Sequence, residues 1–113
     1  MHLDTIYFDF IKQKIKLYET RVYDAKRQQI KLLDKVNFHD RGSKRTFTAL
    51  ITELSWFKNF KEAIEPVGIK KVLPNAKSLK EGVKIYESFP HKEGSYKEGA
   101  NKFGVLRMKF QLV

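Results

Sequence analysis

A lysine, a glutamate and an arginine stand close together near the start of the chain, as Lys16, Glu19 and Arg21. In an extended strand Glu19 and Arg21 point to the same side, about 7 Å apart along the backbone, so their side chains can meet around one ligand. Lys16 has the opposite parity and joins them only from a turn that precedes the strand. A carboxylate between two cations holds both in place, while the cations bind phosphate or carbonyl oxygen. The trio is typical of a site for a polar, partly anionic group, although a salt-bridged rim without a ligand has the same composition.

Further polar residues extend this candidate site. Asp24 and Arg27 follow the trio closely, and Ser78 heads a predicted helix, where free N–H groups can receive an anion. Helix capping alone also explains Ser78. Basic residues that could follow a phosphate backbone are Lys14, Lys26, Arg41, Lys44 and Arg45. A solvated loop would have the same composition as the turn at 41–45, so these positions are candidates for a nucleic-acid surface.

Most other catalytic and cofactor-binding patterns are absent. The chain has no cysteine, which excludes a thiolate nucleophile, a disulfide framework and a zinc ribbon. Its histidines, His2, His39 and His91, lack the helical or hairpin spacing that would bring two of them together. No G-x-S-x-G elbow and no phosphate-binding glycine loop occurs. We therefore expect neither a metal nor a cofactor.

The charge indicates an anionic partner. The chain of 113 residues has 23 lysines and arginines against 13 acidic residues, a net charge of +10. RNA or another polyanion would be attracted to such a surface, and a well-solvated surface that resists aggregation would carry the same charge. The longest apolar run is three residues, and the first residues lack the pattern of a signal peptide. We expect a cytoplasmic protein that does not span a membrane.

The spacing of apolar residues predicts the elements that must position these side chains. A period of three to four predicts helices at 5–14, at 59–68 behind the Asn59 and Glu62 capping box, and at 78–89 behind Ser78 and Glu81. Alternation, or enrichment in β-branched and aromatic residues, predicts strands at 16–24, 35–40, 46–57 and 104–113, with a brief leading strand at 1–3. The segment 91–101 has two glycines and no apolar period, which predicts a mobile loop.

The strand at 46–57 has apolar residues of both parities. They are Phe47, Ala49 and Ile51 on one face and Leu50, Leu54 and Trp56 on the other. This pattern predicts a central strand that is covered on both sides. Trp56 and Phe57 at its end could stack on a base, although an aromatic pair in this position is more often part of the core.

These elements predict an α+β fold. Five strands with helices inserted late suit a small, closed or partly closed β-barrel with two to three short helices packed at its side, because closure removes exposed strand edges. The chain length fits a single domain over residues 1–113.

The segment 7–38 resembles the opening of an ASCH domain, a relative of the PUA fold with the motif G-x-K-x-x-E-x-R on its first long strand. Lys16, Glu19 and Arg21 match the K, E and R, and Lys14 stands in place of the glycine. Further similarity covers Tyr23-Asp24 with Lys26-Arg27, the string LPNAKSLKEGVKIY at 73–86 and the closing FGVLRMKF at 103–110. The resemblance therefore runs over nearly the whole chain in order.

The resemblance implies a barrel of five or six strands with a cleft lined by the motif, and an RNA-binding or nucleotide-binding module. It also leaves an enzymatic alternative, with Lys16 and Glu19 as the catalytic candidates, because one related branch hydrolyses N4-acetylcytidine and another cleaves RNA. The amidohydrolase branch uses a lysine, a threonine and a later glutamate, but Glu19 occupies the threonine position and 73–76 contains no acidic residue. A basic module that binds an acidic protein partner is the third alternative.

Overall fold

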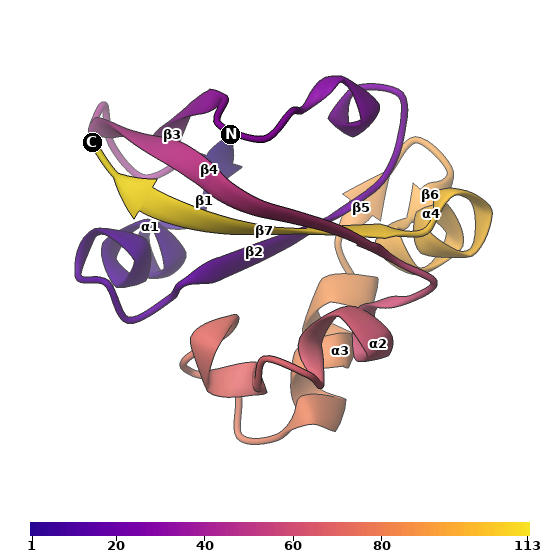
Figure 1. The fold of residues 1–113 in the computed structure, drawn as a ribbon. Helices are drawn as coiled ribbons and strands as arrows, with labels where there is room; N and C mark the ends of the chain where they lie inside the picture. The colour runs from indigo at the N-terminus through magenta and orange to yellow at the C-terminus, as the bar shows by residue number, and fades with distance from the viewer.

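A curled, five-stranded sheet forms the frame of the α+β fold (Figure 1). The computed structural model describes residues 1–113. The strand order is β1-β3-β4-β7-β2, with β1 parallel to β3 and all other pairs antiparallel. The strands are β1 (His2–Leu3), β2 (Tyr18–Val22), β3 (Lys35–Asp40), β4 (Thr46–Phe57) and β7 (Val105–Leu112). The predicted barrel is thus a half-barrel, and its two edge strands, β1 and β2, both come from the first 22 residues.

A bulge in β4 changes the predicted faces of that strand. The register with β7 shifts between Ile51 and Glu53, so Ile51 lies opposite Phe110 while Leu54 lies opposite Met108. Since partners across a ladder share a face, the bulge puts Leu54 and Trp56 on the same face as Ile51. The prediction that they lie on the opposite face is therefore wrong. Trp56 is also 55% exposed, so this end of the strand is not covered on both sides.

Four α-helices surround the sheet, more than the two to three predicted. They are α1 (Thr5–Lys12), α2 (Phe60–Ile64), α3 (Leu79–Glu87) and α4 (Tyr96–Phe103), with 3₁₀ turns at Arg27–Gln29 and Ile69–Lys71. Both predicted N-caps form, because the side chains of Asn59 and Ser78 accept hydrogen bonds from the backbone N–H groups of Glu62 and Glu81. No helix is long and apolar enough to cross a membrane.

The segment 91–101 is not a loop. A two-stranded hairpin of β5 (Pro90–His91) and β6 (Gly94–Ser95) leads directly into α4. The Ser95 hydroxyl accepts a hydrogen bond from the N–H of Glu98 at 3.3 Å, which is a third N-cap that the glycines at 94 and 99 obscure in the sequence. Tyr96 and Ala100 anchor the helix, because both are buried in the core.

The core has a main part beneath α2, α3 and α4. Tyr18 and Val22 of β2 and Val105 of β7 pack there against Phe60 and Tyr86, whose rings stack with centroids 5.1 Å apart. A smaller cluster lies under α1, where Phe8 packs with Phe47 and Phe38. Burying each of these side chains contributes about 2 kcal/mol. Figure 1 shows α1 at one end of the sheet and the other helices toward the opposite end, with β2 passing between them.

Candidate functional site

The turn that ends α1 positions Lys16 in the site. Ile15 N–H donates to the Phe10 carbonyl and Lys14 N–H to the Ile11 carbonyl, the two bonds of a Schellman motif. Such a motif needs a left-handed residue, and Lys14 has φ of +63°. The glycine of the family motif would be free of strain here, and the lysine adopts the same backbone geometry. Lys16 therefore lies in the turn before β2, where it can join the side chains of the strand.

The ammonium, carboxylate and guanidinium of the trio converge, as the sequence predicts. Glu19 Oε1 accepts a hydrogen bond from Lys16 Nζ at 3.2 Å, and Glu19 Oε2 accepts one from Arg21 Nη2 at 3.3 Å. The backbone N–H of Thr20 and the hydroxyl of Tyr86 also donate to Oε1. All of these groups are buried. Glu19 is the centre of the cluster because its carboxylate accepts a hydrogen bond from each of these donors.

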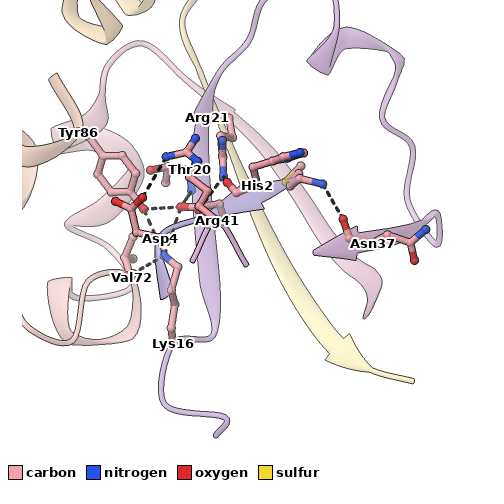
Figure 2. Close-up of polar contacts among 11 residues, drawn as sticks. His2, Asp4, Lys16, Thr20, Arg21, Asn37, Arg41, Val72 and Tyr86 are labelled. Carbon is pink, nitrogen blue, oxygen red and sulfur yellow. Dashed lines mark hydrogen bonds and ion pairs between the residues drawn. The ribbon is translucent and has the colours of Figure 1, made fainter. Parts of the chain in front are cut away.

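Lys16 is fully engaged by the protein. Besides Glu19, its ammonium donates to the Val72 carbonyl and to the Tyr86 hydroxyl, the latter at 3.2 Å (Figure 2). Three acceptors match the three N–H groups of an ammonium. Its 1% exposure lowers the pKa of Lys16, because desolvation outweighs the attraction of Glu19. The ammonium holds the site together and has no spare donor for a ligand.

Electrostatics fix the charge on the other members of the cluster. Burial alone would raise the pKa of Glu19, but Lys16 and Arg21 outweigh it and lower that pKa, so the carboxylate is ionised at neutral pH. Burial and the nearby Glu19 carboxylate raise the pKa of Tyr86, which keeps the phenol protonated. The pKa of Arg21 is raised because Glu19 outweighs the desolvation of the guanidinium.

Arg21 links the two edges of the half-barrel. Its Nη2 donates to the His2 carbonyl at 3.1 Å as well as to Glu19, so the guanidinium connects β2 with β1 (Figure 2). Both of its hydrogen bonds come from Nη2. Its Nε and Nη1 groups can donate to a phosphate or carbonyl oxygen, which would compete with the Tyr96 hydroxyl that interacts with this guanidinium.

A small hollow, the motif cavity, opens beside these residues. Its volume is about 100 Å³, and its polar lining includes Lys16, Glu19, Arg21 and Arg41. Aromatic side chains complete the wall, namely Tyr7, Tyr86, Phe89 and Tyr96. A cavity of about 150 Å³ holds a benzene ring in another protein. The motif cavity alone therefore suits one phosphate or the edge of a base, and a whole nucleotide would extend out of it.

A larger hollow, the basic groove, adjoins the motif cavity and shares His2, Arg21 and Arg41 with it. Its volume is about 610 Å³. It is lined by Met1, His2, Arg21, Lys26, Arg27, Ile30, Lys35, Val36, His39 and Arg41. The lining contains five lysines and arginines and no acidic residue. A hollow with one sign of charge concentrates anions.

Some of the residues predicted to bind a ligand or nucleic acid line the groove, and the others do not. Lys26, Arg27 and Arg41 line the groove. Asp24 lines neither hollow, because its carboxylate pairs with Arg27 at 3.3 Å and with His91 at 2.8 Å. These hydrogen bonds outweigh burial and lower the pKa of Asp24.

The remaining predicted residues lie away from both hollows. Arg45 pairs with Asp40 at 2.9 Å and with Asp9 at 3.1 Å, so its charge is already balanced by acidic side chains of the protein. Lys44 is exposed in the turn after β3. Lys14 lines a separate hollow near the end of β7. Ser78 acts as the cap of α3.

Two of the histidines, which were not predicted to be neighbours, lie side by side. The parallel pairing of β1 and β3 sets His2 opposite His39, with ring centroids 5.0 Å apart. The expectation that no two histidines meet is wrong because it considered helix and hairpin spacing and not a parallel pair. No group of three or more His, Cys, Asp or Glu side chains is placed to hold a metal ion.

Sequence reasoning also missed parts of the site. The carbonyl of Val72 and the buried hydroxyl of Tyr86 hold Lys16, and Lys35 lines the groove. The hydroxyl of Tyr86 is buried, where it donates to Glu19. Trp56 is exposed, with its indole N–H donating to the Phe103 carbonyl at 3.1 Å, so the expectation of a core position does not hold.

Comparisons with known proteins give structural relatives without functional names. No family model matches the chain, and no curated protein matches it. The crystal structure of hypothetical protein PH0355 has a TM-score of 0.83 and 34% identity, covering 100% of this chain and 96% of that one. The solution structure of protein PF0455 from Pyrococcus furiosus has a TM-score of 0.72 and 28% identity, covering 100% of this chain and 98% of that one.

Proposed function

The chain belongs to the same family as hypothetical protein PH0355, and we propose that it is an ASCH-type module that binds RNA or a nucleotide. The observation that carries this proposal is the junction of two hollows. The buried trio opens, through Arg21 and Arg41, onto a groove whose charged side chains are all cationic.

The motif cavity supplies a place for one polar group of the ligand. The Nε and Nη1 groups of Arg21 can donate to a phosphate or to a base carbonyl that replaces the Tyr96 hydroxyl beside the guanidinium. Glu19 holds the guanidinium in a fixed direction, because its Oε2 accepts from Nη2 at 3.3 Å. The aromatic wall, with Tyr96 and Phe89, offers a surface for part of a base.

The basic groove supplies the attraction for the rest of the ligand. Lys26 and Lys35 are exposed and form no ion pair, so they are free to replace the counterions of a phosphate backbone. This contribution is independent of sequence and weakens with salt, whereas contacts in the motif cavity provide selectivity. We infer that the groove guides the backbone and that the cavity receives one base or phosphate.

The proposal is tested by RNA affinity at several salt concentrations. We expect K26A/K35A to weaken the binding of single-stranded RNA about tenfold and to reduce the slope of log K against log salt by about 1.4, because two phosphate contacts are lost. The matched control is K80A/K97A, which removes the same charge from exposed sites outside both hollows. It should bind nearly as tightly as the unaltered protein.

Four results would count against the proposal or for an alternative. RNA affinity that does not change with salt would contradict it, as would equal losses in the two double variants. RNA that is shortened during the incubation would favour the ribonuclease alternative. A protein partner retained after nuclease treatment, together with no RNA affinity, would favour the interaction module.

A further inference from the structure

The side chains of His2 and His39 form a pair at the wall of the basic groove. They lie on adjacent parallel strands, their rings are tilted by 42°, and both residues are exposed and line the groove. Neither imidazole makes a hydrogen bond to a protein acceptor. A bound anion could therefore contact both rings at once.

The charged groups that face this pair are almost all positive. Next to β1 and on β3 they are the amino group of Met1 and the side chain of Lys35, and around the groove they are Arg21, Lys26, Arg27 and Arg41. The nearest carboxylates are already engaged, since Asp4 accepts from Arg41 at 3.1 Å and Asp40 accepts from Thr5 at 2.6 Å. No acid in the groove compensates a charge on either ring.

This surrounding disfavours the protonated form of His2 in the free protein. Partial desolvation of the ring, the Met1 amino group and His39 all lower the pKa of His2. An anion between the rings reverses the effect, because a negative charge within a few ångströms stabilises the protonated form. Proton uptake and anion binding must then favour one another, as linkage requires.

We propose that His2 and His39 form a phosphate site in the basic groove that takes up protons from solvent when the phosphodiester backbone of RNA enters. The proton adds to a ring nitrogen of neutral His2, His39 lies beside it as the second ring that contacts the anion, and no covalent bond to the ligand forms. The identity of the ligand as RNA rests on the proposed function, whereas the coupling between protons and phosphate rests on the histidine pair alone.

The test measures RNA affinity against pH with a ligand that does not titrate. A single-stranded oligouridylate of about ten nucleotides with hydroxyl ends keeps a constant charge between about pH 5.5 and pH 8, so any pH response belongs to the protein. We expect affinity to rise about tenfold from pH 8 to pH 5.5, since a one-unit rise in the pKa of one histidine gives that factor. Calorimetry in buffers of different ionisation enthalpy counts the protons that are taken up.

Three comparisons assign the response to the pair. H2Q/H39Q should respond to pH by about twofold or less. The control H91Q removes the third histidine, which pairs with Asp24 outside the groove, and it should respond like the unaltered protein. Each protein is also measured with an acetylated N terminus, because burial lowers the pKa of the Met1 amine to about 6 and this amine titrates in the same range.

The outcomes separate this inference from the proposed function. RNA binding that is equally tight at both pH values, or a full pH response in acetylated H2Q/H39Q, overturns the inference and leaves RNA binding intact. If RNA does not bind at all, the proposed function fails, and inorganic sulfate, which stays doubly charged in this range, becomes the probe. Sulfate binding that strengthens at low pH and is lost in H2Q/H39Q would support the histidine site, and its absence would overturn it.

Discussion

The motif cavity and the basic groove are neighbours that use charge in opposite ways. In the cavity, Lys16 and Arg21 share one carboxylate, and all three are buried. In the groove, Lys26 and Lys35 are exposed and have no acidic partner. The paired charges in the cavity therefore stabilise the folded protein, whereas the unpaired charges in the groove are available to bind an anion from solution.

The difference separates stability from binding. A change in the cavity leaves a buried charge without its partner, and the free energy of unfolding falls. A change in the groove removes an exposed charge, which has little effect on stability but weakens association with an anion. Arg21 belongs to both hollows, because it pairs with Glu19 and also lines the groove.

Removal of the central carboxylate should have the largest effect on stability. E19Q leaves Lys16 and Arg21 as two buried cations without a counterion, and we expect the free energy of unfolding to fall by about 3–5 kcal/mol. Urea denaturation measures this loss. E53Q is the control, since Glu53 pairs with Lys109 on the surface at 3.3 Å and should matter by less than about 1 kcal/mol. Equal effects of the two variants would show that the buried cluster does not stabilise the fold.

Acidification should have the second largest effect on stability, because it removes the negative charge of Glu19. The pKa of Glu19 is lower in the folded protein than its unfolded value of about 4.3, so its stabilising contribution is complete above that pH and is lost as pH falls through the folded pKa. The loss is about 1.4 kcal/mol for each unit by which the pKa is lowered. Urea midpoints at several pH values below about 5 measure it, and E19Q should show a shallower decline. A decline of the same steepness in E19Q would assign acid sensitivity to other carboxylates.

The smallest effect concerns the turn that leads into the cavity. K14G should raise the free energy of unfolding by about 1 kcal/mol, because φ of +63° strains a lysine and suits a glycine. Thermal unfolding measures the gain. RNA affinity should change little, since Lys14 lies outside both hollows. A loss of stability would indicate that the lysine side chain contributes more than the strain it causes.

Local patterns in the sequence predicted the trio and most of the elements. The parity of Glu19 and Arg21 and the turn position of Lys16 follow from spacings of a few residues, and the structure confirms them. The N-caps at Asn59 and Ser78 are equally local. Helix α4 was missed although Ser95 and Glu98 carry the same signal, because two glycines in the segment suggested a loop.

The parts of the site that depend on distant contacts could not be predicted. Val72 lies 56 positions from Lys16, and its carbonyl carries no side-chain signal. The pairing of His2 with His39 requires the register of a parallel strand pair, which spacing along the chain does not contain. The bulge after Ile51 moved Leu54 and Trp56 to another face, since one extra residue inverts the alternation.

The most direct test of the account is to map RNA contacts by NMR. Oligouridylate added to ¹⁵N-labelled protein should shift the backbone amides that line the basic groove, around Lys26, Lys35 and His39, together with the Nε–H signal of Arg21. Amides of α2, which lines neither hollow, should stay in place. Shifts confined to α2, with Arg21 and the groove unchanged, would contradict the account.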